Sequence, residues 1–410
     1  MTRRHAFILP VVLVVIGLLS LTMAGFMFFV RAELAGMQAE RDAQQARLTA
    51  DSGLEEVITV LRASSDDVST WYDVPDRFRH ALVWAQTYDR SEDPIRQGVS
   101  RRDFLEDDVV SPAWRFSVVA PNFDGLPDTF RYGVTPEASK LNLNAASEDE
   151  IRRLVEPLLM DLQIDNSLDL VDALLDWLDA DDEMRPNGAE SEYYTMDVEP
   201  GYYPKNGPLD TVEELLLIKG FSAAILYGED TNRNGVLDPN EDDGDESFPY
   251  YDNGDGILNH GLAPFVTVWS REVSVGEDGQ SQVREGLVNV NTAPRRVLEA
   301  LDGMTSEALE QIIAVRQELE PEALQDAEWV MQSGAVDPGT YDAIKDRITT
   351  NALQFHVEVL GYADHLKLAR RYEWIVEMRG TLAQVVYTRE LTSLGFAWRV
   401  DDDTFVIEQQ

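Results

Sequence analysis

The chain opens with an uncharged apolar run from Phe7 to Val30, which follows a short basic tip containing Arg3 and Arg4. A helix over this run is about 36 Å long at about 1.5 Å per residue, and a hydrocarbon core is about 30 Å thick. Lipid requires every backbone polar group to be paired internally, which a single helix achieves. The two arginines predict a cytoplasmic N-terminus, with the rest of the chain across the membrane.

The run continues with no proline between Arg31 and Arg62, through a segment rich in the helix formers Ala, Gln and Glu. Four apolar side chains near its end recur at the spacing of one helix face. They are Leu54, Val57, Ile58 and Leu61. We therefore predict one long helix, with residues 7–30 in the membrane and the last turns of residues 31–62 packed on a soluble domain.

Four interpretations fit this N-terminus. A cleaved secretory signal would be cut after small residues, here near Ala24. An uncleaved signal anchor needs only the features above, and the twin-arginine export signal is weakly matched by Arg3 and Arg4. The fourth is a resemblance to type IV prepilins, whose basic leader is cleaved before a Phe and whose helix serves as anchor and then as assembly spine. The matching cut lies between Ala6 and Phe7, with Ala where Gly is usual.

Composition excludes several classes of function. The 410 residues indicate two or three domains outside the membrane. A net charge of −41 opposes nucleic-acid binding, because phosphates need a basic surface, and it suits divalent cations or basic partners. Cysteine is absent, the five histidines have no metal-ligand spacing, and no catalytic motif is present. Carboxylate pairs are too frequent to mark an acid/base pair, so we expect no enzyme.

Local patterns predict the elements of the soluble part. Alternating apolar residues predict strands at 114–120 and 130–134, a hairpin formed by 265–275 and 282–290, and an antiparallel meander from residue 353 onward that closes at 397–400. Amphipathic patterns predict helices at 148–162, 167–178, 209–221, 293–303 and 306–319. In the third of these, Asp210 is the expected N-cap and Gly220 the terminator.

A weak internal repeat relates two segments of the helical region. Residues 141–147 (LNLNAAS) match residues 288–294 (VNVNTAP), and each segment precedes an amphipathic helix. The second unit resembles a helix-hairpin-helix element with its turn at Asp302–Thr305. DNA-binding versions offer backbone amides of a Gly-x-Gly turn to phosphate. This turn has one glycine and an acid, so we predict a structural module.

The most specific motif is a twelve-residue acidic loop, 230–241. It matches the calcium-loop pattern at every diagnostic position, with Gly235 at the sharp turn. The predicted ligands are the side chains of Asp230, Asn232, Asn234, Asp238 and Glu241 and the backbone carbonyl of Val236. We predict that this loop binds Ca²⁺ for structure rather than signalling; the alternative is an acidic solvated loop.

Two other acidic segments are weaker candidates for a cation. Asp252, Asn253 and Asp255 form a degenerate echo of the calcium loop and would help to hold a second ion. The other segment contributes Asp179, Asp181, Asp182 and Glu190.

Taken in order, these segments resemble the K-type minor pseudopilins of bacterial type II secretion, the general secretion pathway protein K family. The resemblance covers the leader and anchor helix, SGLEEVITVL, KLNLNAAS, DWLDADDEMRPNGAESEYY, KNGPLDTVEELLLIKGF, LVNVNTAPRRVLEAL and the C-terminal meander. Most pseudopilins carry Glu at the fifth residue after cleavage, where this chain has Val11, as the K type implies. Ala6, Pro10 and the insert from Asp230 to Asp255 depart from the family pattern.

The resemblance implies an α+β, pilin-like fold, in which a long, partly transmembrane N-terminal helix packs on an antiparallel sheet and a large, mainly helical domain is inserted. The expected divisions are a leader at 1–6, the membrane helix at 7–30, the soluble part of the helix at 31–62, the first part of the pilin-like domain at 63–144, the inserted domain with the calcium loop at 145–350, and the meander at 351–410.

The resemblance also implies a non-catalytic role. The protein would be processed by a prepilin peptidase and would cap the tip of a periplasmic pseudopilus, with I-, J- and H-type minor pseudopilins and the major pseudopilin as partners. It would initiate pseudopilus assembly and support export across the outer membrane, anchored by one helix in the inner membrane. Known calcium binding in the family agrees with Ca²⁺ as the cofactor. The alternative is a membrane-anchored calcium-binding adhesin or a helix-hairpin-helix DNA receptor.

Overall fold

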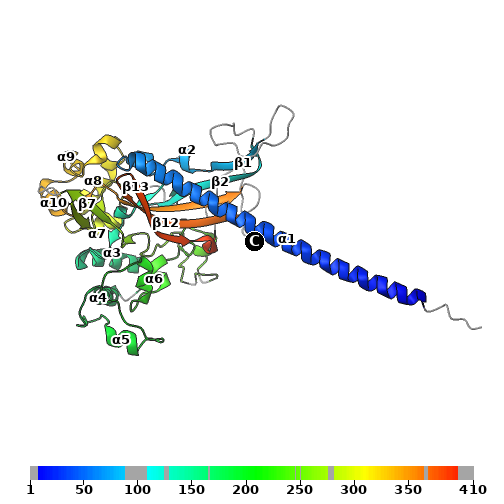
Figure 1. The fold of residues 1–410 in the computed structure, drawn as a ribbon. Coiled ribbons are helices and arrows are strands. Elements are labelled where there is room, and N and C mark those ends of the chain that lie inside the picture. Colours follow the sequence, from blue (N-terminus) through cyan, green and yellow to red (C-terminus); the bar gives the residue numbers. More distant parts are fainter. Residues whose placement is uncertain are drawn as a thin grey trace, which may run out of the picture.

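The computed structural model describes residues 8–87, 109–123, 129–164, 167–244, 246–249, 251–275, 281–363 and 368–395. Figure 1 shows a long helix, α1, a central sheet on which its second half lies, and a mainly helical domain beyond one end of the sheet. The cleavage pair Ala6 and Phe7 and the closing strand at 397–400 lie outside the described residues.

Helix α1 runs unbroken from Ile8 to Ser64, which confirms the single long helix. Its first part is long and apolar enough to cross a membrane and has no buried residue in the qualifying window. Leu19 and Phe28, for example, are 63% and 72% exposed. In Figure 1 this part extends away from all other elements. An apolar surface of this extent needs lipid or protein around it.

The sheet is antiparallel and combines distant parts of the chain. Its main path is β1 (Ala81–Thr87), β2 (Val109–Asn122), β11 (Gln354–Ala363), β12 (Ala369–Arg379) and β13 (Leu382–Glu390), while β3 (Thr129–Arg131) pairs with β2 and β4 (Thr135–Pro136) pairs with β11. The predicted C-terminal meander is therefore confirmed as β11–β12–β13. The predicted strand at 114–120 lies within β2, whereas the one at 130–134 is shorter, since only 129–131 pair as β3.

The core of this layer forms between the end of α1 and the sheet. The predicted stripe of α1 is buried there, opposite apolar side chains of β2, β11 and β12. The cluster includes Val57, Ile58, Leu61, Phe116, Val118, Phe355, Val357, Val359, Trp374 and Val376. Two short helical turns, η1 (Val68–Thr70) and α2 (Pro75–Phe78), connect α1 to β1 and add Phe78 to this core.

Two glycines allow α1 to approach the sheet closely. A Cβ atom at Gly361 of β11 would lie 2.3 Å from the carbonyl oxygen of Ala46 and 2.5 Å from the nitrogen of Ala50. A Cβ atom at Gly53 of α1 would lie 2.6 Å from a methyl carbon of Val359. Backbone atoms cannot retreat as a side chain can, so Gly361 in particular fixes the distance between helix and sheet.

The inserted domain leaves the sheet after β4 and returns at β11, and it has its own hydrophobic core. Its elements are η3 (Glu137–Ser139), β5 (Leu141–Asn142), α3 (Glu148–Asp161), α4 (Ser167–Leu178), α5 (Ser191–Met196), η4 (Val212–Leu217), α6 (Ala223–Tyr227), η5 (Pro239–Glu241), β6 (Val266–Thr267), β7 (Arg271–Val275), β8 (Ser281–Glu285), β9 (Val288–Asn289), α7 (Arg295–Ala300), α8 (Ser306–Arg316), η6 (Pro321–Gln325), α9 (Trp329–Gln332), α10 (Pro338–Ile344) and β10 (Ile348–Thr349).

The internal repeat corresponds to two similar structural units. Strand β5 pairs in parallel with β6, and β9 pairs in parallel with β10. In each unit a buried asparagine, Asn142 or Asn289, accepts from the backbone N–H two residues later and donates to a carbonyl of a distant segment. The helix after each unit, α3 or α7, packs on the other. The repeated NxN pattern thus fixes strand, turn and helix start in both units.

The predicted helix at 209–221 is wrong beyond one short stretch. Only Val212–Leu217 is helical, as the 3₁₀ turn η4, and its N-cap is Thr211 rather than Asp210. Tertiary hydrogen bonds replace the helical ones at its end: the Tyr202 hydroxyl donates to the Leu217 carbonyl at 2.5 Å, and the Lys219 N–H donates to the Tyr194 hydroxyl at 3.2 Å. Gly220 does adopt a left-handed conformation, with φ of 84°.

The predicted hairpin is present in a shorter form. Strands β7 and β8 pair from Arg271–Glu285 to Val275–Ser281. The flanking residues 266–267 and 288–289 pair instead with β5 and β10, because the two repeat units take them into their own small sheets. The hairpin therefore connects the two units and does not extend either of them.

Substitution of Gly361 tests the close approach of α1 to the sheet. Gly361→Ala places a methyl group against backbone atoms, and overpacking of this kind costs about 1–3 kcal/mol. We expect a lower melting temperature for the full-length protein in detergent, followed by circular dichroism. The matched control is Gly36→Ala on the exposed part of α1, which has nothing within 4 Å and should be neutral or slightly stabilising. Equal melting temperatures for wild type and Gly361→Ala would contradict the packing described here.

Candidate metal centre

Helix α4 and the loop after it build an acidic site in the inserted domain. Asp172 and Asp176 lie one turn apart on α4, and both are buried. The loop 179–190 turns back over them. Its backbone N–H at Arg185 donates to both oxygens of Asp176 at 3.2–3.3 Å, and the N–H of Asn187 donates to Asp172 at 3.2 Å. Carboxylates of the helix therefore hold the loop in place.

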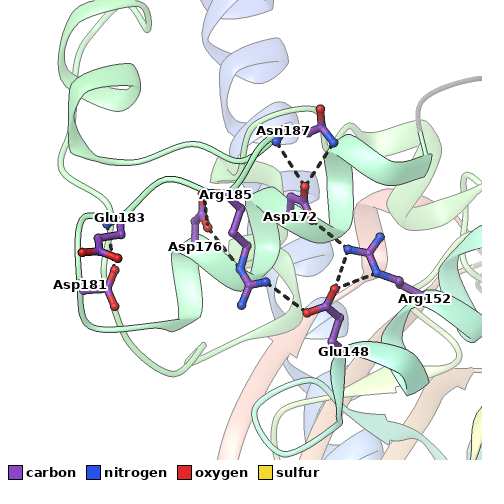
Figure 2. A network of polar contacts seen from close by, with 8 residues as sticks. All are labelled: Glu148, Arg152, Asp172, Asp176, Asp181, Glu183, Arg185 and Asn187. Carbon is purple, nitrogen blue, oxygen red and sulfur yellow. Dashed lines mark hydrogen bonds and ion pairs between the residues drawn. The ribbon is translucent and has the colours of Figure 1, made fainter.

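Two arginines neutralise these buried carboxylates. Figure 2 shows Arg152 between Glu148 and Asp172, and Arg185 between Glu148 and Asp176. Arg152 lies 2.8 Å from each of its partners, and Arg185 lies 3.1 Å from Glu148 and 3.5 Å from Asp176. Asp172 and Asp176 are thus engaged in fixing the loop. Among the described residues, no arginine or lysine forms an ion pair with Asp179, Asp181 or Glu190 of this loop.

The loop brings three further carboxylates together. Oxygen atoms of Asp179, Asp181 and Glu190 lie within 4.8 Å of one another. Glu190 is 95% buried, since its exposed fraction is 5%, and neither of its carboxylate oxygens has a hydrogen-bond partner among the described residues. One oxygen of Asp179 is likewise buried without a partner in this part of the chain. A buried carboxylate without a partner is costly, and a cation at the centre of this cluster would satisfy all three groups.

The electrostatics of Glu190 agree with a cation site. Burial, together with the charges of Asp176, Asp179, Asp182 and Asp181, raises the pKa of Glu190 to about 7. The cluster offers only carboxylate oxygens, which suit Ca²⁺ or Mg²⁺ and not the N/S-preferring Zn²⁺. Asp181 is exposed, so the cluster is accessible from solvent. Asp182 does not belong to it, because its carboxylate accepts from the Ser191 hydroxyl at 2.7 Å.

The structure also brings together the residues predicted as calcium ligands in loop 230–241. Asp230, Asn234 and Glu241 are buried, with exposed fractions of 5%, 0% and 0%. Asn232 and Asn234 donate to the same oxygen of Asp238, at 2.6 and 2.9 Å. Asp230 accepts from the N–H groups of Asn234 and Gly235, both at 2.9 Å, and Gly235 has φ of 69°. Asn232, Asn234 and Asp238 are thus linked directly, while Asp230 and Glu241 bind backbone N–H groups of the same loop, Glu241 accepting from Asp238 at 3.2 Å.

Two carboxylates of this loop lie close enough to repel. Burial, followed by the charge of Asp230, raises the pKa of Glu241 to about 7, and burial raises the pKa of Asp230 to about 6. A divalent cation between them would relieve both effects. The backbone N–H of Val236 donates to Asn234 at 2.7 Å, and its carbonyl remains the predicted main-chain ligand. The predicted ligand atoms of this loop are all oxygens, so the residues fit Ca²⁺.

The predicted second site at Asp252, Asn253 and Asp255 has a different geometry. Asp252 accepts from the N–H groups of Gly244 and Gly254, both at 2.8 Å. Asn253 accepts from Asp255, and Asp255 accepts from Ile257, both at 2.9 Å. Each of the three side chains closes a local turn, and a metal at this segment stays a prediction.

The sequence alone placed Glu190 only in a weaker candidate cation site, whereas the structure makes it the buried centre of the acidic cluster. Its lack of a partner arises from the path of loop 179–190, which depends on the contacts of Arg185 and Asn187 with α4. The available signal was the combination of two acids spaced by one residue, at Asp179 and Asp181, with the GAE triplet that ends at Glu190.

An apolar helix that continues along an antiparallel sheet, with a helical domain inserted between two of its strands, defines a pilin-like protein with an inserted domain. Two models of one family, described as Type II secretion system (T2SS), protein K, match residues 139–227 and 288–351. Two separate regions of the chain therefore match the type II secretion system protein K family, which confirms the resemblance seen in the sequence. The acidic cluster lies within the first matched region, whereas loop 230–241 lies between the two.

Two individual proteins are similar to this chain. A segment of 59 residues is 48% identical to the type II secretion system protein K of Klebsiella pneumoniae, and it covers 14% of this chain and 18% of that relative. A chain in the crystal structure of the GspK-GspI-GspJ complex from the enterotoxigenic Escherichia coli type 2 secretion system is similar with 12% identity and a TM-score of 0.46, over 86% of this chain and 98% of that chain.

The raised pKa values of Glu190, Asp230 and Glu241 predict how stability depends on pH. Between about pH 4.5 and pH 7 the folded chain retains protons that the unfolded chain has lost, so the stability of the cation-free protein falls as pH rises. Calcium bound at these carboxylates would replace these protons. We therefore expect the calcium-induced rise in melting temperature to be larger at pH 7.5 than at pH 5, measured in buffers with chelator or millimolar calcium.

The control for this measurement is Glu190→Gln, which removes one of the three titrating groups and should reduce the pH dependence in chelator. A calcium effect of equal size at both pH values would contradict the assignment.

Proposed function

We propose that this chain is a minor pseudopilin at the tip of the type II secretion pseudopilus. The observation that carries the proposal is the position of the inserted domain. In Figure 1 it lies beyond the end of the sheet that is remote from the apolar part of α1. In a filament whose subunits align their helices along one axis, this is the side on which a subunit above this one would lie. The inserted domain would obstruct such a subunit, so the chain fits the terminal position.

The apolar part of α1 supports the same position. A carboxylate in a membrane is costly unless it is paired. In other pseudopilins the carboxylate at the fifth mature residue meets the terminal amine of a neighbouring subunit. Val11 occupies this place on α1 if cleavage follows Ala6, and its side chain needs no such neighbour.

The remaining parts of the proposal follow from the family resemblance. The chain would be processed between Ala6 and Phe7 by a prepilin peptidase and anchored in the inner membrane, with its bulk in the periplasm. Its partners would be I-, J- and H-type minor pseudopilins and the major pseudopilin, and its role would be non-catalytic initiation of assembly. The adhesin and DNA-receptor alternatives need no pseudopilin partner. In addition, Asp302 in the helix-hairpin-helix-like turn is paired with Arg153 and offers no site for phosphate.

Cysteine crosslinking tests the tip position, since the chain has no cysteine of its own. Leu48 is 57% exposed on α1. Leu48→Cys should form disulfides with cysteines on the helices of I- or J-type partners in cells that assemble pseudopili, and should form none with a second copy of this chain. Tyr203→Cys, at an 81% exposed position of the inserted domain, is the control and should crosslink to no pseudopilin helix. A disulfide-linked dimer of this chain through Leu48→Cys would place a second copy next to the first, as along the shaft, and would refute the proposal.

We also propose that Ca²⁺ supports the inserted domain structurally, at the Asp179–Asp181–Glu190 cluster and at loop 230–241. The unpartnered, buried carboxylate of Glu190 supports the first site, and the converging oxygens of the calcium-loop pattern support the second. Outside the cytoplasm a site in the range of about 10⁻⁴ to 10⁻³ M suffices, because calcium there is abundant. Binding to the folded form alone stabilises it by mass action.

Protection of loop 230–241 by calcium tests the second site. Calcium should reduce proteolysis within residues 228–256 of the full-length protein and raise its melting temperature. The double substitution Asp230→Ala, Glu241→Ala should abolish the protection of this segment, because it removes the first and last ligands. The control Glu246→Ala removes an exposed acid of the same segment that is not a predicted ligand, and it should leave the protection intact. Identical proteolysis with chelator and with millimolar calcium would show that the loop is only a solvated acidic turn.

A further inference from the structure

A fully buried arginine joins the sheet to the inserted domain. Arg371 of β12 has an exposed fraction of 0%, and its Nε donates to the carboxylate of Glu358 on β11, which is 4% exposed. A buried charge of this kind is strongly destabilising without partners, and a pair of charges still needs its remaining polar groups satisfied. The arrangement therefore depends on what the two terminal nitrogens of Arg371 contact.

Those nitrogens contact the backbone of loop 230–241. Nη1 donates to the carbonyl oxygen of Asn232 and Nη2 to that of Arg233, both at 2.6 Å, across 139 and 138 residues of sequence. The planar fork of a guanidinium suits two successive carbonyls. Arg371 thus fixes the loop from outside at Asn232, itself a predicted ligand, and at the next residue, Arg233.

Other contacts hold the same part of the loop in an unusual conformation. Arg233 has φ of 59°, and its guanidinium stacks on the Tyr227 ring at 3.7 Å. Gly235 has φ of 69°, and a Cβ there would lie 2.9 Å from Pro121 of β2. The loop therefore touches both β2 and β12, and its inner surface carries the oxygen cage. The conformation that forms the cage is the one that docks on the sheet.

The junction is not closely packed at this point. A pocket of about 140 Å³, open to solvent, lies between the sheet and the inserted domain, and its lining includes Asp230, Arg233 and Glu358. Side chains do not pack across it, so the hydrogen bonds of Arg371 supply direct contact between the two parts here. A second link, the ion pair of Arg389 on β13 with Glu213 on η4, borders the loop, because Glu213 also lies 3.9 Å from Arg233.

We propose that Arg371 is a positioning residue for the cation site of loop 230–241, and that occupancy of this site is coupled through Arg371 to the docking of the inserted domain on the sheet. The proposal rests on calcium binding by the loop, as proposed above. Arg371 orders the backbone at Asn232 and Arg233 before the cation arrives. The coupling is reciprocal, because whatever Arg371 adds to cation affinity the cation adds to the interface.

Calcium titration calorimetry of the full-length protein in detergent tests the coupling. The parent carries Glu190→Gln, so that the titration reports loop 230–241 and not the acidic cluster. In this parent, Arg371→Lys keeps a charge beside Glu358 but lacks the fork that reaches two carbonyls. We expect calcium affinity to fall by about tenfold, within the usual range of coupling between two sites.

The matched control is Arg370→Lys, on the neighbouring residue of β12, whose side chain is partly exposed and pairs with Glu390 at 3.1 Å. Its calcium affinity should equal that of the parent. Equal affinity for Arg371→Lys and the parent would overturn the coupling alone, since Arg371 would then be a structural residue of the sheet. Absence of any calcium binding in the parent would overturn the calcium assignment of the loop, and the coupling with it.

Hydrogen exchange of the β12 amides gives a second measurement that does not need the Arg371 variant to fold. Calcium should slow exchange in β12 of the parent, because the docked loop and the sheet stabilise each other. The same calcium should have no effect on β12 when Asp230→Ala and Glu241→Ala remove the cage. Exchange in β12 that is unchanged by calcium, while calcium still binds, would overturn the proposal.

Discussion

The contact between the second half of α1 and the sheet holds together parts of the chain that are far apart in sequence. Strand β2 and strands β11 and β12 meet under this helix, at the level of Gly53 and Gly361. The helix can approach so closely because neither glycine has a Cβ, and the apolar stripe from Leu54 to Leu61 is buried as a result. The sheet exists in this form only with α1 on it. Every element of the inserted domain is in turn placed by the two strands, β4 and β11, from which the domain departs and to which it returns.

In the inserted domain the main constraint is electrostatic, because a strongly acidic chain buries several of its carboxylates there. Buried acids near helix starts and turns are matched by single arginines: Glu150 by Arg347, Asp172 by Arg152, and Asp176 by Arg185. Among the described residues, Glu190 and the acids of loop 230–241 have no arginine paired with their carboxylates, since Arg371 binds the loop at backbone carbonyls, and burial and neighbouring carboxylates raise their pKa values. The proposed cations would act at these two places as the arginines act elsewhere.

Sequence reasoning succeeded where local pattern and packing agree. The stripe of α1, helices α3 and α4, and the C-terminal meander all follow from apolar periodicity, because each element buries one face. It failed at 209–221, where Tyr202 and Tyr194 take over hydrogen bonds that a helix would make. Loop 230–241 was proposed as a calcium site from spacing alone, since its oxygens come from one continuous segment, and the site stays a prediction. Its attachment to Arg371 was beyond prediction, because nothing local links residues 139 positions apart. The unpartnered state of Glu190 was equally hidden, as it depends on a path set by other side chains.

The two ends of the inserted domain lie next to each other on the sheet. Strand β4, the last before the domain, pairs directly with β11, the first after it, through Pro136 opposite Phe355 and Thr135 opposite His356. The exit and the return are thus hydrogen-bonded neighbours, as are the two ends of an ordinary short loop. A domain inserted in this way can grow, shrink or be exchanged during evolution while strand register and helix placement stay the same. The sequences of the helix-and-sheet body and of the inserted domain are therefore free to diverge at different rates. Packing between α1 and the sheet constrains the body, whereas contacts at its exposed end constrain the domain.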